Sequence, residues 1–135
     1  MTTINSTVYH AVRKKETAET IKEEGFDIEK PGDNYFGKGV YFFDNEEDAE
    51  IWGEIVLEVD LEYRQGQQFH RGGHERYFEV LQHEIGIDPC LESERVRGWM
   101  LDNGYKLGLT TEDFDDQEEM EIAIVFDTSI IKNIK

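Results

Sequence analysis

Residues 54–63 constrain the fold more than any other part of this chain. Their sequence, EIVLEVDLEY, alternates polar and apolar side chains over most of its length. Because successive side chains of a strand point to opposite faces, this alternation predicts a β-strand with one buried face. A β-sheet is therefore expected.

The rest of the chain mixes strands and helices without strict alternation. Strands are expected at residues 8–12, 35–43 and 121–126, and helices at residues 14–24, 46–52, 75–84 and 91–103. Asp44 or Asn45 can cap the second helix, and Gly25, Gly53 and Gly104 end three of them. Loops are expected at residues 27–34, 64–73 and 110–119. This order predicts the α+β class.

Length and charge limit the classes of protein. A chain of 135 residues is expected to form a single domain, 1–135, with a real core. The 14 basic and 31 acidic side chains give a net charge of −17, which repels phosphate backbones. A protein is therefore expected as the macromolecular partner rather than a naked nucleic acid, although an acidic solubilising surface alone explains the charge as well.

The sequence shows no pattern typical of a membrane segment, a signal peptide, a disulfide framework or a metal site. Apolar runs are only as long as strands, so no membrane segment is expected, and the N-terminus lacks the pattern of a signal peptide. Cys90 is the single cysteine, which excludes a disulfide framework, and Gly72-Gly73 between His70 and His74 argues against a helical metal site. We expect a monomeric cytoplasmic protein without a metal.

Three elements stand out as chemical candidates: His10, residues 36–42 (FGKGVYF) and Glu121. The two glycines beside Lys38 lack a Cβ, so a ligand can approach the backbone there. Tyr41 and Trp52 offer two rings that suit a planar aromatic ligand. Taken singly, each of these residues would more often be a core aromatic, a satisfied core histidine or a solvated carboxylate.

Their joint order resembles the ADP-ribosyltransferase superfamily, in its diphtheria-toxin-like and poly(ADP-ribose)-polymerase-like branch. The resemblance lies in Tyr9-His10, Gly25-Phe26, the FGKGVYF segment and Ala49-x-x-Trp52, and it covers about residues 8–132. The C-terminal part, from Arg97-x-Trp99 to Val125-Phe126-Asp127, resembles small bacterial and phage members. The resemblance implies a split β-sandwich core with surrounding helices.

The same resemblance assigns roles for NAD as the co-substrate, with no metal. His10 would hydrogen-bond the nicotinamide-side ribose, and the backbone of Ala11 would hold the carboxamide. Tyr41 and Trp52 would sandwich the nicotinamide ring. Two further roles follow from the residues themselves: Gly39 allows close approach because it lacks a Cβ, and Arg13 is expected to meet the diphosphate from its place just beyond the histidine strand. Val12 stands where relatives have a hydroxyl residue.

The third catalytic position stays open between two residues. Counting back from Asp127 places the family glutamate on Ile122, and some members carry isoleucine there and rely on a substrate carboxylate. Glu119-x-Glu121 also resembles the Glu-x-Glu element in which the second glutamate is catalytic and the first contacts the acceptor. A one-residue shift reverses the face of a strand, so a bulge would be needed for Glu121, the residue we favour.

A fixed carboxylate suits this reaction, because cleavage of the nicotinamide–ribose bond develops an oxocarbenium-like centre. The resemblance therefore implies a mono-ADP-ribosyltransferase of a bacterium or a phage-infected host, acting as a toxin, phage effector or housekeeping modifier. An NAD glycohydrolase with the same site and a non-catalytic acidic binding or inhibitor protein on the same fold are the alternatives.

Overall fold

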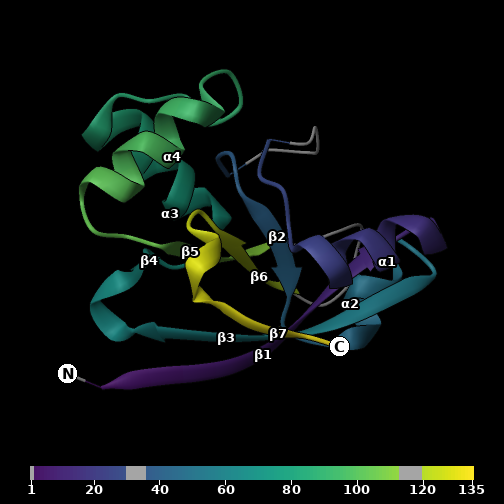
Figure 1. The fold of residues 1–135 in the computed structure, drawn as a ribbon. Coiled ribbons are helices and arrows are strands. Elements are labelled where there is room, and N and C mark those ends of the chain that lie inside the picture. The colour runs from purple at the N-terminus through teal and green to yellow at the C-terminus, as the bar shows by residue number, and fades with distance from the viewer. Residues whose placement is uncertain (1, 30–35, 113–119) are drawn as a thin grey trace.

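The computed structural model describes residues 2–29, 36–112 and 120–135, and it confirms the α+β class. Seven strands form one sheet in the order β4-β5-β6-β2-β1-β3-β7 (Figure 1). The strands are β1 (Thr3–Val12), β2 (Val40–Phe43), β3 (Ile55–Arg64), β4 (Gln68–His70), β5 (Leu107–Glu112), β6 (Met120–Val125) and β7 (Ile131–Ile134). The helices are α1 (Lys15–Glu24), α2 (Glu46–Glu50), α3 (His74–Glu79), which continues as a π-helical segment (Val80–Ile85), and α4 (Ser93–Asp102).

The longest strand pair is β1 with β3, which are antiparallel from Thr3↔Arg64 to Val12↔Ile55. Of the described strand pairs, only β4 with β5 is parallel. The central strand β2 is much shorter than its neighbours: it pairs with β6 from Val40↔Val125 to Phe43↔Ile122, and with β1 at Tyr9↔Phe43. The two arms of the sheet, β1-β3-β7 and β4-β5-β6, are therefore joined through only four residues of β2.

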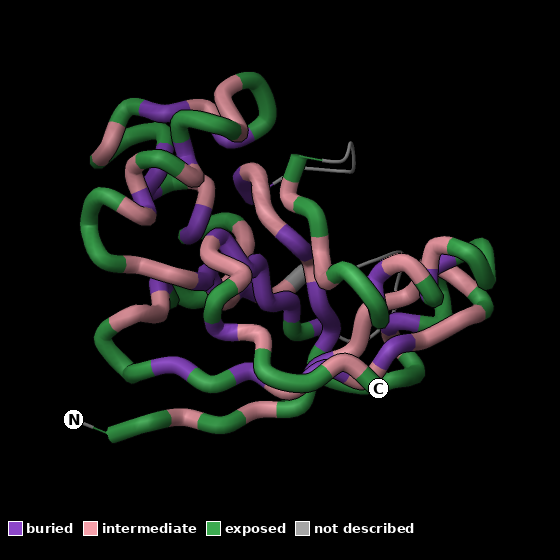
Figure 2. Tube along the Cα trace, viewed as in Figure 1, coloured by how far each residue is buried: buried purple, intermediate pink, exposed green. Residues whose placement is uncertain are grey.

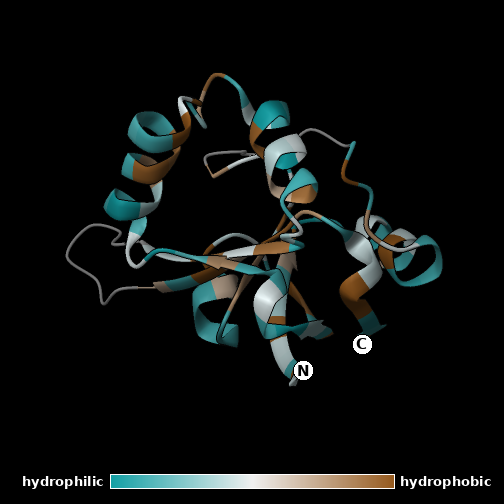
Figure 3. Cartoon of the chain, turned by 90° about the vertical axis from the view of Figure 1, so that its left-hand side faces the viewer, coloured by the Kyte–Doolittle hydropathy of each residue, from teal (hydrophilic) through white to brown (hydrophobic). Residues whose placement is uncertain are grey.

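The two faces of the sheet carry separate cores, because alternate side chains of each strand point to opposite sides. We call them the first face and the second face. Val8 and Phe42 lie in the first core, together with Ala18 and Ile21 of α1. Phe43 and Ile122 lie in the second core, which α2, α3 and α4 cover. Buried residues gather along the central strands and under these helices (Figure 2), and hydrophilic helix surfaces point outward (Figure 3).

Local sequence explains where the first two helices begin and end. Gly25 has φ 84°, a conformation that favours glycine, and its N–H bonds the carbonyl of Ile21 at the end of α1. Asn45 caps α2, since its side chain accepts a hydrogen bond from the N–H of Asp48 at 2.9 Å. Both helices were expected at these places.

Several sequence expectations were wrong in extent. The strand expected at residues 35–43 begins only at Val40, because residues 36–39 form a turn; Tyr35 lies outside the described residues. The loop expected at 64–73 contains a 3₁₀ turn and β4, and the loop expected at 110–119 begins inside β5. The first strand starts at Thr3 rather than Val8, and β7 was not foreseen.

Among the described helices, none is both long enough and apolar enough to cross a lipid bilayer.

Candidate functional site

His10 lies on β1 in a mostly apolar setting. Its ring is 5.0 Å from the ring of Phe26, edge to face, and 5.6 Å from that of Phe42. Its Nδ1 lies 2.8 Å from the backbone carbonyl oxygen of Tyr41. Burial lowers the pKa of the imidazole below its ordinary value of 6.5, so the ring is neutral at neutral pH.

This contact determines the tautomer of His10. A carbonyl oxygen only accepts hydrogen bonds, so Nδ1 carries the proton and donates it to Tyr41. The other ring nitrogen, Nε2, is then an acceptor, and no residue in the described part of the chain donates to it. The histidine is therefore a fixed, neutral hydrogen-bond acceptor.

Tyr41 lies on β2, and its hydroxyl group has a structural task. It accepts a hydrogen bond from the N–H of Phe36 at 2.8 Å and donates one to the carbonyl of Gly37 at 2.7 Å. These two bonds hold the turn that precedes β2. The half-buried ring, rather than the hydroxyl, is thus what Tyr41 offers to a ligand.

The glycines beside Lys38 are required by the chain itself. A Cβ on Gly37, at φ 121°, would lie 2.5 Å from Cγ1 of Val96, and one on Gly39 would lie 2.7 Å from the carbonyl oxygen of Val125. Close packing against α4 and β6 is thus a second explanation for the two glycines, besides the expected room for a ligand.

Lys38 itself connects two segments. Its Nζ lies 2.8 Å from a carboxylate oxygen of Glu29 and 2.9 Å from one of Glu94, and hydrogen bonds to these carboxylates raise its pKa. The ammonium group therefore ties the turn before β2 to the segment after α1 and to α4.

Trp52 and Ala11 lie on the second face, where they pack against the same core as Tyr41. The indole ring stacks on Phe43 at 6.1 Å with an angle of 14° between the planes. Gly53 is tightly placed, since a Cβ there would meet the carbonyl oxygen of Val12 at 2.5 Å. The structure thus brings Tyr41, Trp52 and Ala11 to one face, while the ring of His10 points into the first core.

Glu121 is exposed on β6, and it lies on the face opposite Tyr41. The register of β6 with β5 is continuous from Glu112↔Met120 to Leu107↔Val125, so the described strand contains no bulge. Alternation then places Glu121 on the first face with Ala123, and places Ile122, 4 % exposed, on the second face. The bulge considered from the sequence is absent here. Glu119, the expected acceptor contact, lies outside the described residues.

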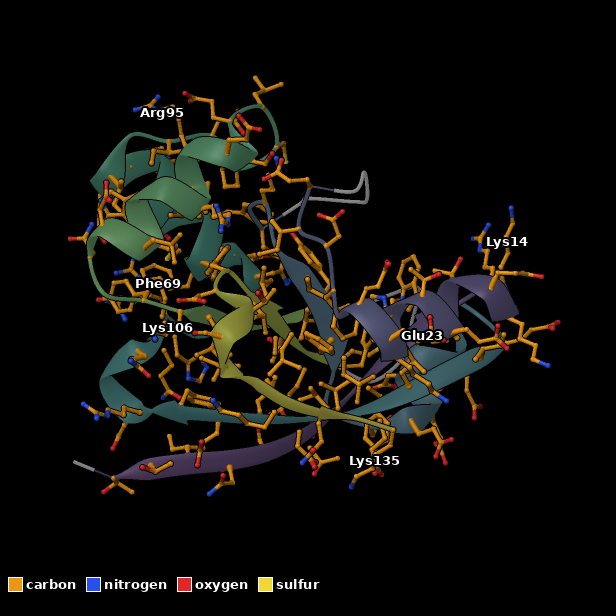
Figure 4. All side chains as sticks on the ribbon, in the orientation of Figure 1. Lys14, Glu23, Phe69, Arg95, Lys106 and Lys135 are labelled. Carbon is orange, nitrogen blue, oxygen red and sulfur yellow. The ribbon has the colours of Figure 1, made fainter. Side chains whose placement is uncertain are left out.

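Besides Lys38, two arginines lie close in the chain to elements of the candidate site: Arg13 directly follows β1, and Arg97 lies on α4. Arg13 is exposed just beyond β1, next to Lys14, which points away from the body of the molecule (Figure 4). Arg97 on α4 donates from Nε to the carbonyl of Phe126 at 3.0 Å and lines a hollow of about 440 Å³ together with Phe26, the ring neighbour of His10. The sequence pattern indicated no role for Arg97 at this site.

That hollow is more acidic than basic. Glu24, Asp27 and Glu29 line it beside the single guanidinium of Arg97. An anionic group bound there would therefore need to lie against Arg97 and away from the three carboxylates.

The described residues contain no group of three or more histidine, cysteine, aspartate or glutamate side chains arranged to hold a metal ion.

No protein-family model matches the chain, and no curated protein is significantly similar to it. The residues and their geometry therefore carry the functional assignment.

Proposed function

We propose that this protein is a mono-ADP-ribosyltransferase, which cleaves the nicotinamide–ribose bond of NAD and transfers ADP-ribose to a macromolecular acceptor. One observation carries the proposal: His10, Tyr41 and Glu121 come from β1, β2 and β6, which are three neighbouring strands of the sheet. The resemblance to the superfamily calls for a histidine, a tyrosine and a glutamate on three separate strands. A sheet whose two arms are joined by a short central strand is compatible with the split β-sandwich of that superfamily.

In this proposal His10 and Tyr41 bind and orient NAD, and they must reach it from opposite faces of the sheet, since the ring of His10 packs in the first core and that of Tyr41 against the second. The lone pair on Nε2 of His10 accepts a hydrogen bond from a ribose hydroxyl, which requires the neutral ring that burial favours. The rings of Tyr41 and Trp52 contact the nicotinamide, and the backbone of Ala11 pairs with its carboxamide. Arg13, or Arg97 from its hollow, meets the diphosphate.

The chemical step is a displacement at the anomeric carbon. The bond from the ribose carbon to the nicotinamide nitrogen breaks, and nicotinamide leaves as a neutral molecule with the bonding electrons. An acceptor nucleophile forms the new bond and loses its proton. A carboxylate stabilises the developing positive charge, and Glu121 is the chain's own candidate. Where Ile122 fills the third position instead, the acceptor supplies that carboxylate.

A non-catalytic binding protein is the second candidate. The observation that favours it is that Glu121 lies on one face of the sheet, whereas Tyr41 and Trp52 lie on the other. A protein of net charge −17 on this scaffold would then act by occupying a basic partner.

The test follows nicotinamide release and transfer of label from NAD in a bacterial lysate. The parent protein is compared with His10→Ala, Glu121→Gln and, as a matched histidine control, His83→Ala at an exposed position. We expect His10→Ala to lower release by about 10²-fold, since losing one preorganised group typically has that effect, and His83→Ala to leave release unchanged. Free ADP-ribose without labelled macromolecules would identify an NAD glycohydrolase. If the parent protein released no nicotinamide, the non-catalytic binding protein would be the remaining candidate.

A further inference from the structure

The two arms of the sheet separate where β2 ends. Among the described strands, β1 pairs with β2 only at Tyr9, so its residues 3–8 pair with β3 alone. Asp44 directly follows β2, and its N–H donates to the carbonyl of Glu121 at 3.2 Å. We call this junction, with residues 3–8 of β1 on one side and the start of β6 on the other, the fork. Figure 1 shows β1 and β3 diverging from β4 and β5 toward the N-terminus.

A cleft of about 170 Å³ lies in the fork. Its walls come from both arms and are apolar at the base: Val8, Leu61, Leu107, Leu109 and Ala123. Since a cavity of about 150 Å³ holds a benzene molecule, this cleft has room for one side-chain-sized group. Its polar lining includes Ser6, Tyr63 and His70.

Charge selects the kind of group that fits. Asp44 and Glu121 both line the cleft, and the described residues that line it include neither lysine nor arginine. The net charge of the whole chain, −17, also favours a cation over an anion as the bound group. An aliphatic chain that ends in a cation matches both the apolar base and the acidic lining. Lysine and arginine side chains have this form.

The backbone of β1 gives the second recognition element. An edge strand presents N–H and C=O groups that can pair with an added strand, which is a common way to bind extended peptides. Residues 3–8 of β1 border the cleft through Ser6 and Val8. A peptide strand paired here would point alternate side chains into the cleft.

We propose that the fork binds an extended basic segment of a partner protein, with its backbone paired to β1 and one lysine or arginine side chain in the cleft facing Asp44. This inference goes beyond the proposed function, because binding at the fork needs neither NAD nor His10. An enzyme with this surface would use it to hold a basic acceptor protein near the sheet.

The test measures peptide binding by fluorescence anisotropy in the absence of NAD. The probes are a labelled peptide of three Val-Arg repeats, a Val-Glu counterpart, and a Val-Arg peptide with alternate backbone amides N-methylated. We expect the Val-Arg peptide to bind and the Val-Glu peptide not to bind. N-methylation should weaken binding of the Val-Arg peptide by about tenfold, because the strand pairing is lost. No binding of the Val-Arg peptide up to about 1 mM, or equal binding after methylation, overturns the proposal.

Variants locate the binding. Ser6→Lys places a cation in the cleft, and Thr7→Lys is its matched control, because Thr7 lies next in β1 and its hydroxyl bonds Asp60 outside the cleft. We expect at least about a tenfold loss for Ser6→Lys, a smaller loss for Asp44→Asn, and little change for Thr7→Lys. Equal losses for the two lysine variants would mean attraction to net charge only, and would overturn the assignment to the fork. Thermal melting confirms that each variant is folded, and nicotinamide release measured in parallel tests the proposed function separately.

Discussion

The imidazole of His10 and the backbone of Tyr41 are joined by a hydrogen bond of 2.8 Å across two neighbouring strands. The acceptor is a main-chain carbonyl, so the bond survives any substitution at Tyr41 that preserves the strand. It also requires the proton on Nδ1, which leaves Nε2 as an acceptor. A ligand that donates a hydroxyl hydrogen bond therefore meets a ring already in the right tautomer.

The first prediction concerns the pH dependence of stability. Burial lowers the pKa of His10 below 6.5, so above that pH the ring is neutral both folded and unfolded and contributes no slope. As the pH falls below 6.5, the unfolded chain takes up the proton first, and the free energy of unfolding decreases until the pH passes the folded pKa. Urea unfolding at about pH 7.5 and about pH 5.5 measures this loss.

His10→Gln should reduce the acid-side loss of stability, because it removes the titrating group, while His83→Gln should keep it. For each variant, the quantity compared is the change in urea midpoint between the two pH values. Carboxylates also titrate in this range, but they contribute equally to both variants. An unchanged acid slope in His10→Gln would show that the histidine is not held neutral by burial.

The second prediction concerns the hydroxyl of Tyr41. Tyr41→Phe removes the bonds to Phe36 N–H and Gly37 C=O, and it should lower the free energy of unfolding by about 1–3 kcal/mol. Tyr105→Phe is the matched control: among the described residues its hydroxyl accepts only from the exposed Arg71, at 3.2 Å, so little change is expected. Hydrogen exchange at the amide of Phe36 should become faster in Tyr41→Phe alone. Equal stability of the two variants would contradict the structural role.

The sequence could predict strands whose pattern is local. The alternation of residues 54–63 and the apolar run at 121–126 match β3 and β6 closely. The three-residue β4 could not be predicted in this way, because it exists through pairing with β5, about 40 residues later in the chain. The acidic segment 110–119 (TTEDFDDQEE) suggested a loop, but its first three residues belong to β5. Leu107 and Leu109, which lie on one face, were the available signal for this strand.

The candidate site was predictable as a set of residues but not as a geometry. Pattern alone placed His10, Tyr41 and Glu121 on three strands. It could not show that the Tyr41 hydroxyl is bonded to Phe36 and Gly37, or that Glu121 and Tyr41 face opposite sides. Those facts depend on register and on the turn before β2, which are set by packing far along the chain.

The third prediction separates the two candidates for the third catalytic position. Glu121→Gln removes the charge of an exposed side chain and should lower the free energy of unfolding by no more than about 1 kcal/mol, the usual limit for an exposed ionic contact. Ile122→Glu buries a carboxylate in the second core opposite Phe43, and it should cost about 3 kcal/mol or more. Chemical denaturation checks both values. A stable Ile122→Glu protein would mean that this position opens into a polar site, which would favour Ile122 as the third position.

The last prediction compares the same substitution, glycine to alanine, at two positions. We expect it to lower the free energy of unfolding at one position and to raise it at the other. At Gly39 a Cβ would lie 2.7 Å from the carbonyl oxygen of Val125 and 2.9 Å from Cγ2 of Ile124, so β2 and β6 would have to separate. Gly39→Ala should lower the free energy of unfolding by about 2 kcal/mol or more. Gly98 lies in the exposed part of α4 with nothing within 4 Å, and Gly98→Ala should raise it by roughly 0.5–1 kcal/mol through helix propensity. Urea midpoints give both signs, and nicotinamide release adds a functional comparison: a movement of β2 at Gly39 displaces Tyr41, whereas Gly98→Ala leaves the site intact. A Gly39→Ala protein as stable as Gly98→Ala would show that β2 does not approach β6 this closely, and that the glycine is kept for ligand access instead.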